Sequence, residues 1–320
     1  MIWSGVWLAV SAGPARAEDN DLVLSRLGTC IDDTGAPDAT CGNAVDVIGS
    51  NIDFRSLASE LGVVMAPRLI EPADTLGFGG FQFSADIAFT SIDSDASYWR
   101  GREDPAGDSV LQTVGLTARK GIWLPVPSFE VGLGVLHLVD SHIWAAQGYA
   151  KFALHEGFHD FPLPSLSVRG AASRMTGSDA LDLTVASIDV TLSKSFGIAG
   201  SFNLAPYAGW NWLIIVPRSE VIDKTPHIDA RDVMSDQNLS FVFKDQDDII
   251  RNRIFAGLKF KYYVFVLGLE ANFALEGTSS DNRGGTDLDC SLAISPTIDC
   301  DATDEAKLQS TYSVSIGMDF

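Results

Sequence analysis

From residue 77 onward the chain alternates apolar and polar positions with a period of two. Apolar residues occupy the odd positions from Phe81 to Phe89, and mostly polar residues lie between them. Because successive side chains of a strand point to opposite faces, this pattern predicts a strand with one apolar face. The pattern recurs nine times, at residues 114–118, 129–135, 144–154, 166–172, 186–192, 204–214, 254–262, 265–273 and 312–320. The sequence therefore predicts an all-β chain of about ten strands.

The links between these segments alternate in length. Those after the second, fourth, sixth and eighth segments are short, those after the first, seventh and ninth are long and polar, and tighter turns lie near Asp140 and Gly177. Strands of about ten residues, with short turns at one rim and long loops at the other, are typical of a transmembrane antiparallel up-and-down β-barrel. An even strand number puts both chain ends on one side of the membrane, so we expect the N- and C-termini to lie in the periplasm. Residues 239–243 can extend a hairpin above the membrane, so eight or twelve strands also stay open.

The last ten residues, TYSVSIGMDF, carry the most specific signal. They alternate through Tyr312, Val314, Ile316, Met318 and Phe320 and end on an aromatic residue. This segment resembles the C-terminal strand of bacterial outer-membrane β-barrel proteins, a likeness of class that covers residues 77–320. The resemblance implies a Gram-negative outer membrane as location, with lipid and lipopolysaccharide as surroundings. It also implies that the barrel-insertion machinery reads this strand.

Residues 1–17, MIWSGVWLAVSAGPARA, differ from the barrel region. An apolar run followed by Ala15-Arg16-Ala17 predicts a cleaved signal peptide, although the usual basic start is missing and a buried strand is the alternative. The sequence holds no stretch of 18 consecutive apolar residues, so we expect no membrane-spanning helix.

Residues 18–76 do not alternate. Asp53 is a candidate helix cap and Pro67 a candidate end, and the residues between them form one apolar stripe: Phe54, Leu57, Ala58, Leu61 and Val64. We expect this segment to lie in the periplasm, where it plugs the barrel, caps it or docks a periplasmic or envelope protein. A packed lid without a partner is the alternative.

Charged residues fall on the face that the barrel would turn inward: Asp86, Arg119, Glu130, Lys151, Arg169, Asp189, Arg253, Lys259 and Glu270. Opposite signs in mixed order predict a cross-bracing network, because buried ions need partners. A barrel of ten strands leaves little room beyond its own side chains, so we expect a packed interior, with a thin channel as the alternative.

Cysteines and net charge limit the remaining possibilities. Cys30 with Cys41, and Cys290 with Cys300, form two local pairs that predict short-loop disulfides in an oxidising compartment. With 22 Lys and Arg against 42 Asp and Glu, the formal charge of −20 argues against nucleic acid as a partner. The long loops are acidic; solvated surface charge is the expected state, and calcium binding is the alternative.

One stretch, His155 to His159, has the letters of the HExxH zinc-hydrolase motif. That motif needs a helix, whereas Gly157, Pro162 and Pro164 interrupt it and strands flank it. We expect an ordinary periplasmic turn here, with adventitious metal binding and zinc hydrolysis as remote alternatives.

The sequence thus predicts a non-enzymatic outer-membrane protein with neither catalytic residues nor a cofactor. We expect a porin-like, narrow channel or transporter for small solutes, gated by residues 18–76. The alternative is a structural or adhesive anchor within a cell-envelope complex.

Overall fold

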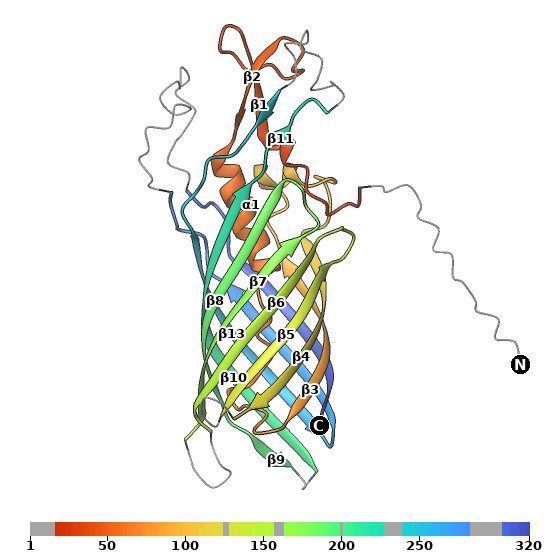
Figure 1. The fold of residues 1–320 in the computed structure, drawn as a ribbon, viewed down its shortest axis with the longest axis vertical. Coiled ribbons are helices and arrows are strands. Elements are labelled where there is room, and N and C mark those ends of the chain that lie inside the picture. The colour runs from red at the N-terminus through yellow and green to blue at the C-terminus, as the bar shows by residue number, and fades with distance from the viewer. Residues whose placement is uncertain (1–16, 124–127, 157–162, 199–200, 227–238, 282–302) are drawn as a thin grey trace, which may run out of the picture.

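A closed β-barrel forms most of the molecule. The computed structural model describes residues 17–123, 128–156, 163–198, 201–226, 239–281 and 303–320. Within them, an antiparallel sheet runs in the order β13-β14-β15-β3-β4-β5-β6-β7-β8-β10, and β10 pairs again with β13 to close the ring (Figure 1). The ring strands are β3 (Phe81–Ser91), β4 (Val110–Ile122), β5 (Phe129–Leu138), β6 (Trp144–His155), β7 (Ser165–Thr176), β8 (Leu181–Ser193), β10 (Phe202–Ser219), β13 (Ile249–Tyr262), β14 (Phe265–Ala274) and β15 (Gln309–Asp319). The predicted all-β barrel and its ten strands are confirmed.

The two ends of the barrel differ. Short links lie at the lower end of Figure 1, together with the C-terminus and the short strand β9 (Phe196–Ile198), which pairs with the start of β10. The described parts of three long links lie at the upper end: the first long link (residues 92–109), the second (220–248) and the third (275–308). We call these the turn end and the loop end. The tight turn at Gly177 requires glycine, since its φ is 95° and an added Cβ would lie 2.0 Å from the carbonyl oxygen of His142.

The barrel wall is apolar outside and polar inside. Outward residues such as Leu133 and Ile316 expose 72% and 64% of their surface, whereas the inward residues Glu130 and Arg119 expose 0% and 3%. A continuous apolar outer surface of this size is stable only against lipid, so the barrel has the architecture of an outer-membrane protein. No helix among the described residues is both long and apolar enough to cross a membrane.

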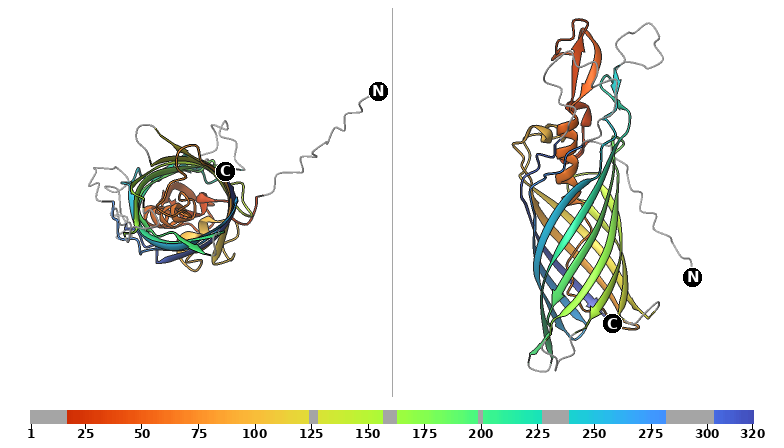
Figure 2. Two further views of the ribbon diagram at one scale, coloured as in Figure 1. Left: turned by 90° about the horizontal axis from the view of Figure 1, so that it is seen from below. Right: turned by 90° about the vertical axis from the view of Figure 1, so that its left-hand side faces the viewer.

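Residues 17–64 lie at the loop end, as both side views show (Figures 1 and 2). Their elements are η1 (Leu24–Leu27), β1 (Gly28–Asp32), β2 (Ala44–Gly49) and α1 (Asn51–Val64), joined by η2 (Ser97–Gly101), β11 (Ile222–Asp223) and β12 (Ser240–Phe241) from the long links. The predicted helix exists, but Ser50 caps it, not Asp53: the Ser50 hydroxyl accepts a hydrogen bond from the Asp53 N–H. Residues 239–243 extend a hairpin at the loop end, β11 with β12, and add no strand to the ring.

After α1 the chain runs through the lumen to the turn end, where the Phe81 N–H donates to the Phe320 carbonyl (2.9 Å) and β3 begins. Figure 2, left, shows this segment inside the ring. The expectation that residues 18–76 and the C-terminus share one end of the barrel is therefore wrong. The start of β3 and the C-terminus do meet at the turn end, but the residues before the crossing lie at the loop end. Alternation along strands does not encode this crossing, because the segment that crosses is not a strand.

Candidate functional site

Residues 65–77, which we call the crossing segment, are fixed in the lumen by Glu71. Its Oε2 lies 2.7 Å from Arg119 Nη1 and 3.1 Å from Lys151 Nζ, and the Tyr149 hydroxyl donates to its Oε1 (2.8 Å). Glu130, on the wall, accepts from the same three side chains at 2.9–3.2 Å. Two carboxylates thus balance two cations, and buried ions of this kind are tolerable only when they are paired.

Further contacts hold the segment on either side of Glu71. Towards the loop end, Arg68 Nε lies 2.8 Å from Asp86 Oδ2, and the Arg68 carbonyl accepts from Arg169 Nη1 (2.6 Å). Towards the turn end, the Leu76 N–H donates to Glu130 Oε2 (2.9 Å). The wall therefore binds the crossing segment along its length.

The wall residues around it share one row of strand pairing. Glu130 lies opposite Lys151, Lys151 opposite Arg169, Arg169 opposite Asp189, Asp189 opposite Asn211, and Asn211 opposite Arg253: these six residues come from β5, β6, β7, β8, β10 and β13. Cross-strand neighbours on one face lie within reach of each other's side chains. The row therefore forms a polar belt around much of the lumen.

The structure places all nine sequence-predicted lumen charges on the inner face. Six are bound into the crossing-segment network or paired next to it: Asp86, Arg119, Glu130, Lys151, Arg169 and Asp189. The other three have neutral partners, Asn211 for Arg253 (2.9 Å), Gln82 for Lys259 (3.2 Å) and Tyr207 for Glu270 (2.9 Å).

Sequence reasoning missed Arg68, Glu71 and Tyr149. Tyr149 lies at an inward position of an alternating strand, so its placement could have been predicted. Arg68 and Glu71 come from a segment without periodicity, and nothing in the sequence marks them as lumen residues.

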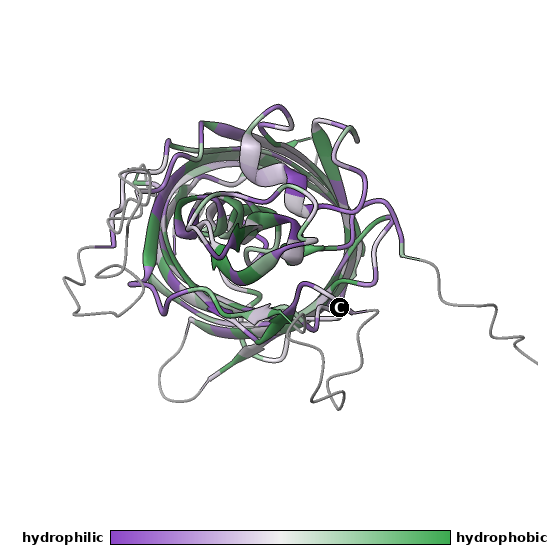
Figure 3. Cartoon of the chain, turned by 90° about the horizontal axis from the view of Figure 1, so that it is seen from above, coloured by the Kyte–Doolittle hydropathy of each residue, from purple (hydrophilic) through white to green (hydrophobic). Residues whose placement is uncertain are grey.

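The crossing segment leaves little free space beside it. A cavity of about 20 Å³ lies next to Arg68 and Glu71, against Asp86, Gln147 and Tyr149. That volume holds roughly one water molecule. Side chains of the wall and of the crossing segment therefore fill most of the lumen at this level. Seen from the loop end, backbone lies within the outline of the ring (Figure 3).

Above the lumen, α1 organises what we call the head: residues 17–64 with the described parts of the three long links. The helix is buried on all sides, including Arg55 and Glu60 at 0% exposure. Glu60 binds the first long link, accepting hydrogen bonds from the Tyr98 hydroxyl (3.0 Å) and the Trp99 indole N–H (2.7 Å). Burial raises the pKa of the Glu60 carboxyl above its ordinary value, against these hydrogen bonds, which favour the charged form.

The same helix binds the second long link. Arg55 Nη1 donates to the Asp247 carbonyl (2.8 Å) and to Gln246 Oε1 (3.3 Å), and Phe54 stacks on Phe243 with ring centroids 4.4 Å apart. All three contacts come from the first two turns of α1.

The third long link is bound next to it. Arg55 Nη2 donates to Ser279 Oγ (3.0 Å), and the Ser59 hydroxyl donates to Asp304 (2.6 Å). One helix therefore joins all three long links into a single packed unit.

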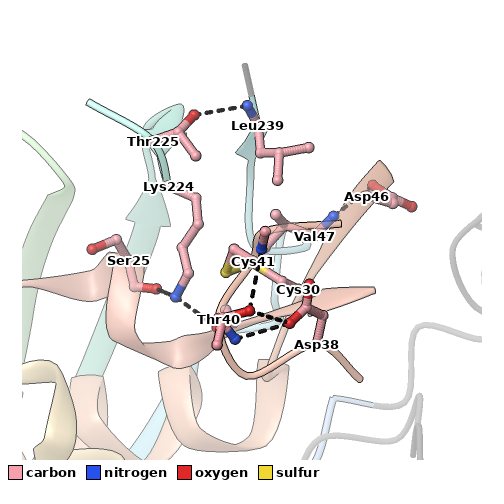
Figure 4. The surroundings of a disulfide bond; sticks show 12 residues. Ser25, Cys30, Asp38, Thr40, Cys41, Asp46, Val47, Lys224, Thr225 and Leu239 are labelled. Carbon is pink, nitrogen blue, oxygen red and sulfur yellow. Dashed lines mark hydrogen bonds between the residues drawn. A yellow bond between two sulfur atoms is a disulfide. The ribbon is translucent and has the colours of Figure 1, made fainter. Parts of the chain in front are cut away.

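A small disulfide-bonded hairpin tops the head (Figure 4). The predicted Cys30–Cys41 bond is confirmed, with Cα atoms 5.3 Å apart. Beneath it, Lys224 of the second long link donates to the carbonyls of Ser25 (2.7 Å) and Gly28 (3.0 Å). Cys290 and Cys300 lie outside the described residues, so their pairing stays a prediction.

Two other predicted features can be located. The C-terminal residues Tyr312, Val314, Ile316, Met318 and Phe320 all face outward and are exposed. In the HEGFH stretch, His155 ends a strand, and Glu156 accepts from the Thr75 N–H (3.0 Å), while residues 157–162 lie outside the described part. No group of three or more potential metal ligands occurs among the described residues.

Solved structures similar to this chain are outer-membrane barrels. No family model and no curated protein matches the sequence. Ail, the attachment invasion locus protein of Yersinia pestis, is 13% identical, with 76% of this chain and 99% of Ail covered and a TM-score of 0.27. The transport unit of the autotransporter AIDA-I from Escherichia coli is 9% identical, with 85% and 99% covered and a TM-score of 0.33. The assignment as a barrel rests on its own closed strand pairing.

Proposed function

We propose that this protein is a non-enzymatic outer-membrane anchor whose closed barrel holds a binding head at the cell surface. The observation that carries this proposal is the path of the chain through its own lumen. A chain that crosses the barrel, and is fixed there by Glu71, places about fifty preceding residues at the loop end. The proposal assigns the loop end to the outside, the C-terminus to the periplasm, and neither a cofactor nor a catalytic residue to the protein.

The construction of the head supports binding over gating. α1 continues directly into the crossing segment, and α1 is bonded to all three long links. Withdrawing the segment as a plug would require the buried charges of Glu71, Arg119 and Lys151 to separate, at a cost of several kcal/mol. It would also pull on a helix buried in the head. A firmly built head suits recognition of a partner at the surface.

A narrow gated channel is the second candidate. The observation in its favour is that the crossing segment forms no helix or strand, while the wall around it is lined with charged residues. Planar-bilayer recordings distinguish the two. The anchor predicts no conductance from the full-length protein, and reproducible single-channel steps would favour the channel.

Surface display is tested directly by epitope insertion. An epitope between Thr34 and Gly35, in the exposed turn of the disulfide hairpin, should be stained by antibody on intact cells. The same epitope between β9 and β10, at the turn end, should be stained only after the outer membrane is permeabilised. The reverse pattern would refute the proposed orientation and with it the anchor.

A further inference from the structure

One sector of the outer wall, on β7, β8 and β10, differs from the rest of the apolar surface. The ten ring strands, all within the described residues, carry a Lys, Arg, Asp or Glu at only four outward positions: Lys120, Arg174, Asp182 and Arg218. Lys120 lies near the turn end, whereas the other three lie together near the loop end. Arg174 Nη2 lies 2.7 Å from Asp182 Oδ2, and Asp182 lies opposite Arg218 in the strand pairing. Two arginines thus flank one aspartate, which leaves a net positive charge on a protein of formal charge −20.

These arginines lie where headgroups of a surrounding membrane would be. On β7, Arg174 lies two residues before Thr176, and Thr176 lies opposite the outward Trp144 of β6, which is 49% exposed. Outward tryptophans mark the edge of the hydrocarbon region in barrels of this class. The Arg174 side chain is 66% exposed, so its guanidinium is accessible from the membrane side.

Beneath Arg174 the wall is unusually flat. Six neighbouring outward positions carry only glycine or alanine: Ala146, Gly148, Ala150, Gly170, Ala172 and Ala186. They are contiguous, since Gly148 lies opposite Ala172, Ala150 opposite Gly170, and Ala172 opposite Ala186. A Cβ added at Gly170 would meet no atom within 4 Å.

Larger side chains border this flat area. Leu133, opposite Gly148, is 72% exposed, and Ile188, opposite Gly170, is 50% exposed. The small residues therefore form a strip of low side-chain height, which we call the groove, running down the wall from Arg174 between these larger side chains.

We propose that this sector binds one phosphorylated lipid of the leaflet around the loop end, with a phosphate on Arg174 and Arg218 and an acyl chain in the groove. The guanidinium fork matches phosphate oxygens in geometry and charge, and it binds them with charge-assisted hydrogen bonds. The groove lets the lipid's acyl chain lie in van der Waals contact with the wall, which projecting leucine and phenylalanine side chains would prevent. The proposal rests on the barrel being embedded in a membrane, and it holds whether the head binds a partner or gates a channel.

Native mass spectrometry of the detergent-solubilised full-length protein tests the site. Lipid A with two phosphates is the probe, and fully dephosphorylated lipid A is its partner probe. We expect one lipid to bind, with about tenfold preference for the phosphorylated form, as one or two charged hydrogen bonds would give. Equal binding of the two forms would overturn the proposal.

Three variants locate the site. R174Q/R218Q should abolish the preference for phosphate, G170L should weaken binding of both lipids by filling the groove, and K120Q, at the opposite rim, should bind like the wild type. Heat-modifiable gel migration checks that each barrel is folded. If R174Q/R218Q does not fold, the wild-type protein is measured at high salt instead. Loss of its phosphate preference there, together with weaker lipid binding by G170L, supports the site. A phosphate preference that persists at high salt overturns it. An R174Q/R218Q protein that keeps the phosphate preference refutes the site, as does a G170L protein that binds both lipids like the wild type.

Discussion

Glu71 places a single carboxylate among two buried cations and a tyrosine hydroxyl, and thereby fixes the crossing segment to the wall. Its neighbours Arg119 and Lys151 come from strands whose alternation predicts inward charges, so half of this network could be derived from the sequence. Glu71 itself could not, because its segment has no periodicity to assign it a face. The predicted charges on the inner wall indicated only that they need partners within the lumen.

E71Q should therefore destabilise the folded protein by about 3 kcal/mol, since the side chain keeps its shape but leaves Arg119 and Lys151 short of one negative charge. Urea unfolding in detergent micelles measures this change. The matched control is E103Q, which removes a half-exposed pair with Arg26 and should cost less than about 1 kcal/mol. Equal losses in the two variants would contradict the role given to Glu71.

A second residue pair makes the head sensitive to pH. His142 Nδ1 lies 2.7 Å from Asp21 Oδ2, and this hydrogen bond and the Asp21 charge raise the pKa of His142 above 6.5. Partial burial raises the pKa of Asp21, but hydrogen bonds from the backbone of Glu18 and His142 outweigh it and hold that pKa below 3.8. The His142 contribution is complete below pH 6.5 and is lost as pH rises through its raised pKa. The Asp21 contribution is complete above pH 3.8 and is lost as pH falls through its lowered pKa.

The protection factor against hydrogen exchange of the Asn20 amide, whose N–H donates to the Asp140 carbonyl (2.9 Å), should accordingly be highest between those two pKa values and fall on either side. H142Q should remove the alkaline limb and leave the acid limb. An alkaline limb that persists in H142Q would exclude His142 as its origin.

At the scale of elements, the ten strands followed from alternation alone, and their outward faces are the apolar ones. The helix followed from its stripe, but its surroundings did not. Arg55, Ser59 and Glu60 lie off that stripe and would be solvent-exposed on an ordinary surface helix, yet they are fully buried. An amphipathic pattern predicts one apolar contact face of a helix. It cannot predict polar contacts that come from loops distant in the sequence.

Gly62 tests how α1 docks on the barrel. An added Cβ would lie 2.6–2.8 Å from three side-chain carbons of Ile215 on β10. G62A should therefore destabilise the head, although alanine is the better helix former by about 1 kcal/mol. Thermal unfolding followed by near-UV circular dichroism measures the effect. Adding I215A should recover part of the loss, and purely additive effects would show that the two positions do not interact.

At the scale of the whole molecule, the barrel and the head depend on one continuous chain. Deleting residues 18–64 removes most of the head but keeps the crossing segment, whereas deleting residues 18–77 removes both. We expect the shorter deletion to stay closed in planar bilayers and the longer one to conduct, because only the longer one empties the lumen. Conductance from the shorter deletion would show that the head, and not the crossing segment, blocks the passage.

Because the ring closes around its own chain, and because α1 is bonded to the long links at the loop end, the head acts as a mechanical stopper. Force applied to the C-terminus from below is carried by the β15–β3 ladder, and force applied to the head from above is carried through the crossing segment into the start of β3. Neither pull can draw the chain through the ring unless the head unfolds or the barrel opens. An object bound to the head would therefore be tethered by the mechanical strength of strand pairing as well as by the hydrophobic hold of the membrane.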